Sequence, residues 1–510
     1  MNYFISLLIN YNGDKTMLVK DLFPSCDDYR TIKGITSDSR FLKEGYIFIP
    51  LSGKNFSGEE FISEAINKKA LVIVLDKYIS NITYSIIYVN NNFQCLIDCL
   101  KKFYGCPFND LCLIGITGTD GKTTTSTIIN YLLSSKYESG YIGTNGIYLG
   151  NYYEDSLFTT PILSENYRLI RKGSDLSLNY LTMEISSQGI SNNRITDILF
   201  DIAVFTNLSH EHLDTHLTME EYFKTKFKLF KQLKTKNLKI INKDDPYSIY
   251  FENLDNVIFF SIYTPSDYQV KNISYENGYT IFDLYTKNYI YRNLKINRME
   301  EYNIYNVLPG IIISLLSGIK IETLYELLKN LPIVPGRLEQ ILSPYPYNIY
   351  IDFAHTPNAL KAVLCSLKKR TKNRIIIVCG AAGGKDKSKR PLMGKVACEY
   401  ADFVVFTSED PRKEDPNQII NQMVSELTST NYICITERKK AIDEAFKIAK
   451  TGDSIIITGK GRENYFDIDG VIYTYSDYEY IKKKVAEWQP FFTNLQEYIF
   501  RNFLLLDYIC

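Results

Sequence analysis

Short apolar runs of strand length alternate along the chain with longer segments that mix polar and apolar residues over helical lengths. The runs cover residues 70–75, 111–116, 180–185, 201–208, 238–241, 348–354, 374–380, 402–408 and 454–461. They are nearly continuously apolar and rich in β-branched residues, which is typical of parallel strands covered by helices on both faces. The pattern predicts an α/β protein built from several units.

Two turn-like segments, CPFND at 106–110 and LPIVPGRLE at 331–339, interrupt this alternation. They predict an N-terminal unit over residues 1–108, a central unit over 109–335 and a C-terminal unit over 336–510. Met17 is a candidate for the true start, in which case residues 1–16 are a spurious extension. The aromatic and apolar tail from about residue 488 is predicted to be a docking helix rather than a membrane anchor.

Composition narrows the classes of partner. The formal net charge is +0, so no bulk attraction to nucleic acid or to an anionic membrane is expected. The ten cysteines include no CxxC pair and no Cys/His cluster at zinc spacing, which indicates free thiols in a reducing compartment. No apolar run reaches the ~18 residues of a membrane span, and the start lacks the features of a signal peptide. We expect a cytoplasmic monomer whose ligands are small molecules.

The stretch LIGITGTDGKTTTS, residues 113–126, has the order strand, glycine turn, helix. Gly118 and Gly121 permit backbone conformations that direct several N–H groups into one concavity, and the helix N-terminus adds its positive dipole end. Lys122 can reach the β- and γ-phosphates, and the Thr123 hydroxyl can bind Mg²⁺. Because Ile116 departs from the strict spacing, a tight turn without ligand is the alternative, but the context favours a phosphate loop.

Three of the four histidines lie in NLSHEHLDTH, residues 207–216, directly after an apolar run. Glu184 ends another apolar run. An imidazole and a carboxylate at neighbouring strand ends, beside a phosphate loop, suit a divalent cation. For His210 or His216 alone, a surface hydrogen bond is the favoured role; ligation by His212 together with Glu184 is favoured only with the resemblance that follows.

Thirteen motifs occur in a specific order: TSDSR, TGTDGKTTT, TTP, MEISS, HEHLDTH, EEYFKTKFKLF, INKDDP, YNIYN, VPGRLE, DFAHTPNAL, GGKDKSKRPLMG, TSEDPR and GKGRENY. From about residue 30 to about residue 480 this order resembles the Mur ligases, in particular those that add the third amino acid in peptidoglycan synthesis. The resemblance implies a UDP-binding N-terminal α/β domain, a central P-loop ATPase domain and a Rossmann-like C-terminal domain. It also implies ATP-driven amide formation, in which the D-Glu carboxylate of UDP-N-acetylmuramoyl-L-alanyl-D-glutamate becomes an acyl phosphate that an amine then attacks.

The resemblance also implies residue roles. The residues expected to bind ATP are Gly118, Thr119, Asp120, Gly121, Lys122, Thr123, Thr124, Asn303, Asn306, Arg337 and Asp352, with His355 beside them. The residues expected to hold the UDP-sugar and its dipeptide are Ser37, Ser39, Lys54, Asn55, Phe56, Thr159, Thr160, Ser186, Asn192 and Arg194. The expected Mg²⁺ ligands are Thr123, Glu184, His212 and Lys226, and the expected catalytic residues are Lys122, Glu184, His212 and Lys226.

Lys226 lies in the lysine-rich stretch EEYFKTKFKLF. It is expected to face inward and to carry a carbamate made with CO₂, as N6-carboxylysine, whereas the other lysines of the stretch are solvated. The carbamate turns a cation into an anion and so into a ligand for a second Mg²⁺.

Three positions depart from the family pattern. Asp120 stands where Asn is usual, Phe158 where Asn usually precedes Thr-Thr-Pro, and Gln188 where His usually follows the two serines. We interpret all three as tolerated changes beside the reacting groups.

The residues expected to hold the incoming amino acid are Lys385, Asp410, Arg412, Gly459 and Glu463. Members that add meso-diaminopimelate usually have Arg and Asn at the positions of Lys385 and Asp410. Without the bidentate Arg, and with an added carboxylate in the protein, the site should disfavour an amino acid whose side chain ends in a carboxylate. It should attract one whose side chain ends in an ammonium group alone. The sequence therefore favours L-lysine or L-ornithine over meso-diaminopimelate.

Two other functions stay open from the sequence. A polyglutamate-adding ligase such as a folylpolyglutamate synthetase would not need the N-terminal unit. A nucleotide-binding scaffold without catalysis would be expected to have lost Lys122, Thr123, Glu184, His212 or Lys226, all of which are present.

Overall fold

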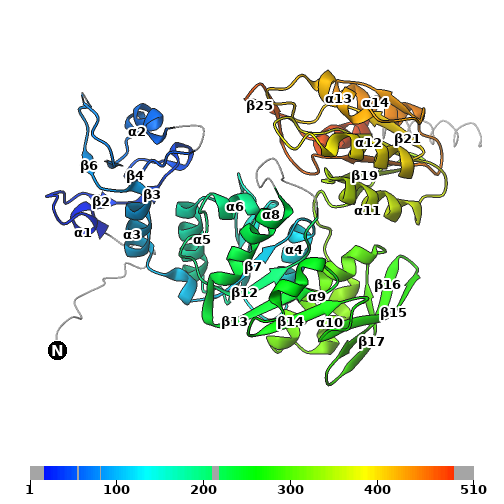
Figure 1. Ribbon diagram of the computed structural model, residues 1–510, viewed down its shortest axis with the longest axis horizontal. Coiled ribbons are helices and arrows are strands. Elements are labelled where there is room, and N and C mark those ends of the chain that lie inside the picture. The colour runs from blue at the N-terminus through cyan, green and yellow to red at the C-terminus, as the bar shows by residue number, and fades with distance from the viewer. Residues whose placement is uncertain (1–16, 54–56, 81, 210–217, 488–510) are drawn as a thin grey trace, which may run out of the picture.

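The computed structural model describes residues 17–53, 57–80, 82–209 and 218–487 (Figure 1). Several sequence predictions lie outside these residues: the 1–16 extension, the tail from 488, the sugar-binding set Lys54, Asn55 and Phe56, and His210, His212 and His216.

A small parallel sheet forms the N-terminal domain, with strand order β3-β4-β5-β6. The strands are β3 (Gly34–Thr36), β4 (Tyr46–Phe48), β5 (Val72–Leu75) and β6 (Ile86–Tyr88), preceded by the pair β1 (Met17–Leu18) and β2 (Thr31–Ile32); the helices are α1 (Val19–Leu22), α2 (Ile62–Asn67) and α3 (Asn92–Tyr104). Helix α3 is capped at its start by Asn91, whose Oδ1 accepts a hydrogen bond from Gln94 N at 2.9 Å. It ends at Gly105, which has φ of 72°. Its apolar face shares one core with α5 (Leu163–Asp175) of the next domain, so the two domains pack directly.

The central domain is an 11-stranded sheet of order β10-β9-β8-β11-β7-β12-β13-β14-β15-β16-β17. Its strands are β7 (Cys112–Thr117), β8 (Ser139–Gly143), β9 (Gly146–Leu149), β10 (Tyr152–Glu154), β11 (Tyr180–Glu184), β12 (Phe200–Phe205), β13 (Leu233–Asn242), β14 (Val257–Ser261), β15 (Tyr268–Glu276), β16 (Tyr279–Thr286) and β17 (Ile290–Ile296). Its helices are α4 (Lys122–Leu133), α5 (Leu163–Asp175), α6 (Ser187–Ser191), α8 (Met219–Phe227), α9 (Glu301–Leu316) and α10 (Ile321–Lys329).

Helices cover both faces of the parallel part of this sheet. On one face α4 and α9 pack through residues such as Ile128, Leu132, Leu308 and Ile311. On the other face α5 and α8 contribute to the core that continues into the N-terminal domain. Because β8, β11, β7 and β12 are parallel, their carboxyl ends meet at one edge. Residues 117–123, 184 and 206 lie at that edge.

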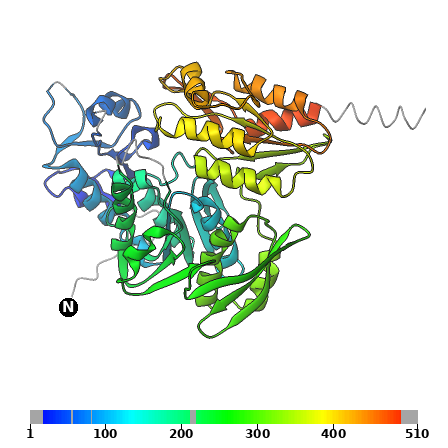
Figure 2. The same ribbon diagram turned by 45° about the vertical axis from the view of Figure 1, so that its right-hand side comes forward.

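The C-terminal domain is a six-stranded sheet of order β18-β19-β23-β20-β21-β22, parallel except for β18. Its strands are β18 (Glu339–Ile341), β19 (Asn348–Asp352), β20 (Ile375–Cys379), β21 (Phe403–Phe406), β22 (Tyr432–Cys434) and β23 (Ser454–Thr458), followed by the hairpin β24 (Tyr465–Ile468) and β25 (Val471–Thr474). The helices α11 (Pro357–Lys368), α12 (Lys389–Tyr400) and α13 (Pro416–Val424) cover one face, and α14 (Arg438–Ile448) covers the other. In both views α11 lies on the side that faces the central domain (Figures 1 and 2).

The α/β prediction is confirmed, and each of the nine apolar runs overlaps a strand. The antiparallel strands β9, β10, β15, β16 and β17 were not predicted. Several of them alternate polar and apolar residues, as in YQVKNISYE of β15, because one sheet face is solvated. The domain boundaries at 108 and 335 stay predictions. None of the helices in the described ranges combines the length and the hydropathy that a bilayer crossing requires.

Candidate active site

The phosphate loop joins β7 to α4 through two glycines that no other residue could replace without strain. Gly118 has φ of 153°, and a Cβ there would lie 1.9 Å from Thr206 Oγ1. Gly121 has φ of 83°, and a Cβ there would lie 2.4 Å from Asn306 Oδ1. The loop therefore passes close to the end of β12 on one side and to α9 on the other, and its glycines allow this close approach.

Backbone hydrogen bonds fix the loop against the segment that follows β12. Thr119 N donates to Asn207 O and Asp120 N donates to Asn207 Oδ1, both at 2.9 Å. Thr206 Oγ1 donates to Asp120 O at 2.8 Å. Because the backbone of Asp120 makes most of these bonds, the change from Asn to Asp at this position keeps the loop in place. Lys122 folds back over the loop, with Nζ 3.0 Å from Gly118 O and 2.8 Å from Thr119 O.

Glu184 lies at the end of β11 directly beside this loop and is 1% exposed. Thr123 Oγ1 donates to Glu184 Oε2 at 2.9 Å, and Thr144 N donates to Oε1 at 3.1 Å. The Tyr141 hydroxyl also donates to Oε1. Burial, together with the neighbouring carboxylate charge, raises the pKa of Tyr141 well above its ordinary value, so this phenol is a permanent donor. Tyr141 and Thr144 were missed from the sequence; both lie in or just after β8, which is the neighbouring strand.

Lys226 is buried on α8 and points at the same loop. Its side chain is 1% exposed, Nζ donates to Gly118 O at 2.7 Å, and the ammonium lies 4.5 Å from the ring centroid of Tyr222. By contrast, Lys224 on the same helix is exposed and pairs with Glu220. The structure therefore brings Lys122, Thr123, Glu184 and Lys226 to one edge of the central sheet.

The donors at this edge fit a magnesium ion. Thr123 and Glu184 offer hydroxyl and carboxylate oxygens 2.9 Å apart, and oxygen donors are what Mg²⁺ prefers. The Lys226 side chain donates a hydrogen bond and cannot bind the metal in that form. It becomes a metal ligand only when it is carboxylated. Within the described residues no three His, Cys, Asp or Glu side chains form a ready metal cluster, and His212 lies outside those residues.

The residues predicted to hold the dipeptide continue from Glu184 along the same surface. Thr160 Oγ1 donates to Glu184 O at 2.9 Å, and Ser186 N donates to Thr160 Oγ1 at 2.9 Å. Arg194 Nη1 donates to Thr160 O at 2.9 Å. Thr159 Oγ1 lies 3.1 Å from Thr144 Oγ1, whereas Asn192 is exposed at the end of α6.

Phe158 contacts two guanidinium groups that come from different domains. Arg40, in the loop that follows β3 and contains Ser37 and the buried Ser39, lies 5.1 Å from the ring centroid. Arg194 of the central domain lies 4.2 Å from it. The aromatic ring thus makes cation–π contacts with both guanidinium groups, which no Asn could make. Gln188, the other departure, is half-buried on α6.

The segment between the central and C-terminal domains also reaches the phosphate loop. Arg337 Nη2 donates to Thr123 Oγ1 at 3.1 Å. The neighbouring carboxylate, Asp352, accepts from Leu338 N at 2.5 Å and from Ala354 N at 2.7 Å, and burial raises its pKa. Both of its oxygens hold the backbone, so a contact of Asp352 with ribose stays a prediction. Asp352 O accepts from Gly459 N at 3.1 Å, which links this segment to the amino-acid residues.

Asp410 does not offer a free carboxylate. Lys460, fully buried, donates from Nζ to both Asp410 oxygens at 2.9 Å and to Glu463 Oε2 at 2.9 Å. The sequence argument for lysine or ornithine assumed that Asp410 presents an unpaired negative charge. In the structure Asp410 is instead paired with Lys460 of the motif GKGRENY, which it shares with Glu463.

The other predicted amino-acid residues lie on loops that touch one another. A Cβ on Gly383 would lie 1.9 Å from Pro411 O, and a Cβ on Gly384 would lie 3.8 Å from Arg412 Nη1, so the loop that carries the half-buried Lys385 adjoins Arg412. Arg412 Nε lies 3.8 Å from Asp467 Oδ2.

Gly459 faces a carboxylate that the sequence analysis missed. Gly459 has φ of 104°, and a Cβ there would lie 1.9 Å from Glu409 Oε2. Burial raises the pKa of Glu409, and its Oε2 has no hydrogen-bond partner among the described residues.

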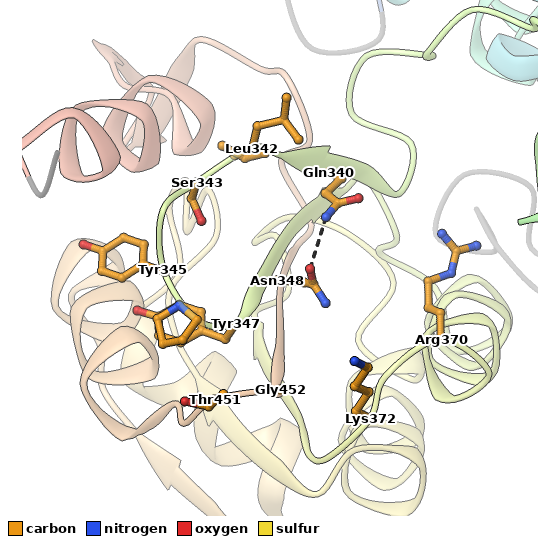
Figure 3. Close-up of a pocket in the computed structure, with 12 residues that line it drawn as sticks. Gln340, Leu342, Ser343, Tyr345, Tyr347, Asn348, Arg370, Lys372, Thr451 and Gly452 are labelled. Carbon is orange, nitrogen blue, oxygen red and sulfur yellow. Dashed lines mark hydrogen bonds between the residues drawn. The ribbon is translucent and has the colours of Figure 1, made fainter. Parts of the chain in front are cut away.

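A cavity of about 400 Å³ lies elsewhere, next to the amino end of β19. Figure 3 shows Tyr345 and Tyr347 on one side of it and Arg370 and Lys372 on the other. The candidate site is at the opposite, carboxyl ends of the strands.

Comparisons with known proteins agree with this geometry. Residues 31–96 match the Mur ligase family catalytic domain, residues 116–314 the Mur ligase middle domain, and residues 336–461 the Mur ligase glutamate ligase domain. The UDP-N-acetylmuramoyl-L-alanyl-D-glutamate–2,6-diaminopimelate ligase of Clostridium botulinum is 35% identical over 90% of this chain and 96% of its own. UDP-N-acetylmuramyl-tripeptide synthetase 2 of Oceanobacillus iheyensis is 36% identical over 85% of this chain and 90% of its own.

Solved structures give the same picture. A structure of a UDP-N-acetylmuramoyl-L-alanyl-D-glutamate–2,6-diaminopimelate ligase is 27% identical, with a TM-score of 0.58 over 93% of this chain and 99% of the other. The MurF ligase of Thermotoga maritima in complex with ADP shares the fold, with 21% identity and a TM-score of 0.62 over 83% of this chain and 93% of the other.

The three matched domains define a three-domain, ATP-dependent acid–amino-acid ligase, and this chain has a phosphate loop at one edge of its central sheet. The chain belongs to the Mur ligase family, and within it to the tripeptide-forming type that acts in peptidoglycan synthesis.

Proposed function

We propose that this ligase joins 2,6-diaminopimelate to the D-Glu carboxylate of UDP-N-acetylmuramoyl-L-alanyl-D-glutamate through an acyl phosphate. The observation that carries the proposal is the convergence on one loop. Lys226 donates to Gly118 O, and Thr123 of the same loop donates to Glu184. A phosphate held there would lie beside Lys122 and beside Glu184, a carboxylate suited to a magnesium ion, and both cations would neutralise the charge that builds up during phosphoryl transfer.

The residues of the chain have distinct tasks in this proposal. Lys122 leaves the two loop carbonyls and neutralises charge on the transferred phosphoryl group, and Arg337 adds a second cation from the C-terminal side. Thr123, Glu184 and carboxylated Lys226 would hold magnesium, which when bound neutralises phosphate charge. Carboxylation of Lys226 consumes CO₂, forms an N–C bond and releases two protons, one when the ammonium becomes an amine and one when the amine adds to CO₂. Thr160 and Arg194 orient the dipeptide so that its D-Glu carboxylate faces the γ-phosphate.

The choice of amino acid follows from the pairing of charges. The C-terminal site contains charged groups of both signs that lie close together. Lys460 contacts Asp410 and Glu463, and Arg412 lies next to Asp467. A site that holds groups of both signs suits the zwitterionic distal end of 2,6-diaminopimelate better than the bare ammonium of lysine or ornithine. The names of the Clostridium botulinum and Bacillus cereus relatives, both 2,6-diaminopimelate ligases, support the same choice.

We also propose the division of labour among the domains. Residues 1–108 bind the UDP-sugar, residues 109–335 bind ATP, and residues 336–510 bind the amino acid. One copy of the chain brings the described catalytic residues together, so a monomer suffices. The cytoplasm supplies both the nucleotide and the nucleotide-linked sugar.

A panel of amino acids in a phosphate-release assay tests this function. With MgATP and UDP-muramoyl dipeptide, we expect release to require an amino acid and to be fastest with meso-diaminopimelate. Faster release with L-lysine or L-ornithine would overturn the choice of amino acid. Release with glutamate and a folate acceptor, but not with the muramoyl dipeptide, would overturn the function itself.

A further inference from the structure

Glu300 is a buried carboxylate at the junction of the central and C-terminal domains. It directly precedes α9 and is 3% exposed. Its side chain makes no capping hydrogen bond to the helix backbone, so helix capping does not explain it. A buried carboxylate is costly unless partners satisfy its oxygens.

The partners of Glu300 come from both domains. Asn303 Nδ2 of α9 donates to Oε2 at 2.6 Å. Ser366 Oγ of α11 donates to Oε1 at 2.7 Å, and the guanidinium of Arg370, just beyond α11, forms an ion pair with the same oxygen. Two of the three partners therefore leave if the C-terminal domain moves away.

The hydrogen bonds continue from Asn303 to the phosphate loop. Asn306 Nδ2 donates to Asn303 Oδ1 at 3.2 Å. Thr125 Oγ1 on α4 donates to Asn306 Oδ1 at 3.4 Å, and the same oxygen faces Gly121. Buried groups therefore connect α11 of the C-terminal domain to the start of α4. Arg337, which bonds to Thr123, gives a second contact between the same two regions.

We propose that Glu300 is a positioning residue that couples docking of the C-terminal domain to the orientation of Asn303 and Asn306 beside the phosphate loop. When Ser366 and Arg370 are docked, the Glu300 carboxylate is fixed and holds Asn303, which in turn holds Asn306. When they are absent, the carboxylate turns toward water and both asparagines lose their fixed amide orientation. Nucleotide binding and domain docking thereby stabilise each other, as linkage requires. The inference rests on the proposed function only where it treats Asn303 and Asn306 as nucleotide contacts.

Glu300→Gln tests the coupling, because it keeps the size of the side chain but removes the charge and places an amide against Asn303 or Ser366. The matched control is Glu301→Gln, which changes the next carboxylate; Glu301 accepts from Tyr263 and touches no C-terminal residue that the structure records. MgATP binding is measured by calorimetry on the full-length protein without other substrates. We expect Glu300→Gln to weaken binding about tenfold and Glu301→Gln to leave it within about twofold.

Variants on the C-terminal side separate coupling from local damage. Ser366→Ala lies in another domain, yet it should weaken MgATP binding in the same direction by about threefold. Arg370→Gln added to Glu300→Gln should cost less than the sum of the two single changes. Unchanged ATP binding in both Glu300→Gln and Ser366→Ala would overturn the proposal, as would equal losses in Glu300→Gln and Glu301→Gln. If Glu300→Gln does not fold, Ser366→Ala alone decides.

These measurements separate the coupling from the ligase function. Wild-type protein that binds MgATP but forms no amide would contradict the proposed function, and the coupling would still be decided by ATP binding. Wild-type ligase activity together with unaltered ATP binding in the variants would contradict the coupling alone.

Discussion

The phosphate-loop edge of the central domain and the amino-acid edge of the C-terminal domain use charge differently. At the first edge Lys122 and Lys226 donate to backbone carbonyls of the loop. In the proposed function Lys122 turns from these carbonyls to the phosphate, whereas Lys226 becomes an anion when it is carboxylated. At the second edge Lys460 is bound to Asp410 and Glu463. The comparison shows that the charge a site presents to its ligand depends on how its own side chains pair with one another. The type of residue at a single position does not reveal that pairing.

Removing Lys226 should have the largest effect. Lys226→Ala should lower turnover about a hundredfold or more, because it removes the anionic ligand that forms when this lysine is carboxylated. Phosphate release with all substrates measures the loss, and added formate or acetate should restore part of it. Lys224→Ala, the exposed neighbour on α8, should stay within about twofold of wild type. Full activity in Lys226→Ala would contradict the carbamate role.

Removing Lys460 tests the paired site. Lys460→Met leaves the buried Asp410 carboxylate without its cation, so unfolding in urea should show a loss of about 3 kcal/mol. The freed negative charge should also shift preference from meso-diaminopimelate toward L-lysine. Lys440→Met, at an exposed lysine on α14, serves as the control for stability. Unchanged stability and preference in Lys460→Met would show that its pairing has no effect on the site.

Phe158 tests the contact between the N-terminal and central domains. Phe158→Ala removes both cation–π contacts, so KM for the UDP-muramoyl dipeptide should rise about threefold to tenfold with little change in kcat. Leu157→Ala changes the exposed neighbouring residue and should leave KM unaltered. An equal effect of the two substitutions would argue against a specific role of the ring.

Lys385→Arg should have the smallest effect. A guanidinium can hold a carboxylate with two hydrogen bonds where an ammonium acts as a point charge, so kcat/KM for meso-diaminopimelate relative to L-lysine should rise about twofold to fivefold. Competition between the two amino acids in one reaction measures this ratio directly. A ratio that stays constant would place Lys385 away from the distal carboxylate.

Contiguous motifs made the first edge predictable from the sequence. The order strand, Gly118, Gly121, Lys122 follows from local backbone chemistry, and Glu184 could be placed because parallel strands end at one edge. Tyr141, Thr144 and Glu300 could not be found this way, since each acts through a tertiary contact with a residue far along the chain. The pairing of Lys460 with Asp410 was missed for the same reason, because the two lie on loops after different strands. The antiparallel strands were not predicted because a strand with one solvated face has a weaker apolar pattern.

Transfer of oxygen tests the central claim most directly. The substrate is UDP-muramoyl dipeptide whose reacting D-Glu carboxylate carries ¹⁸O, and the released phosphate is analysed by mass spectrometry. If the carboxylate attacks the γ-phosphate and the amine then breaks the C–O bond, each released phosphate keeps one carboxylate oxygen. We expect one ¹⁸O per phosphate for each amide formed. Amide formation with unlabelled phosphate would contradict the acyl phosphate and with it the role assigned to the loop, Glu184 and Lys226.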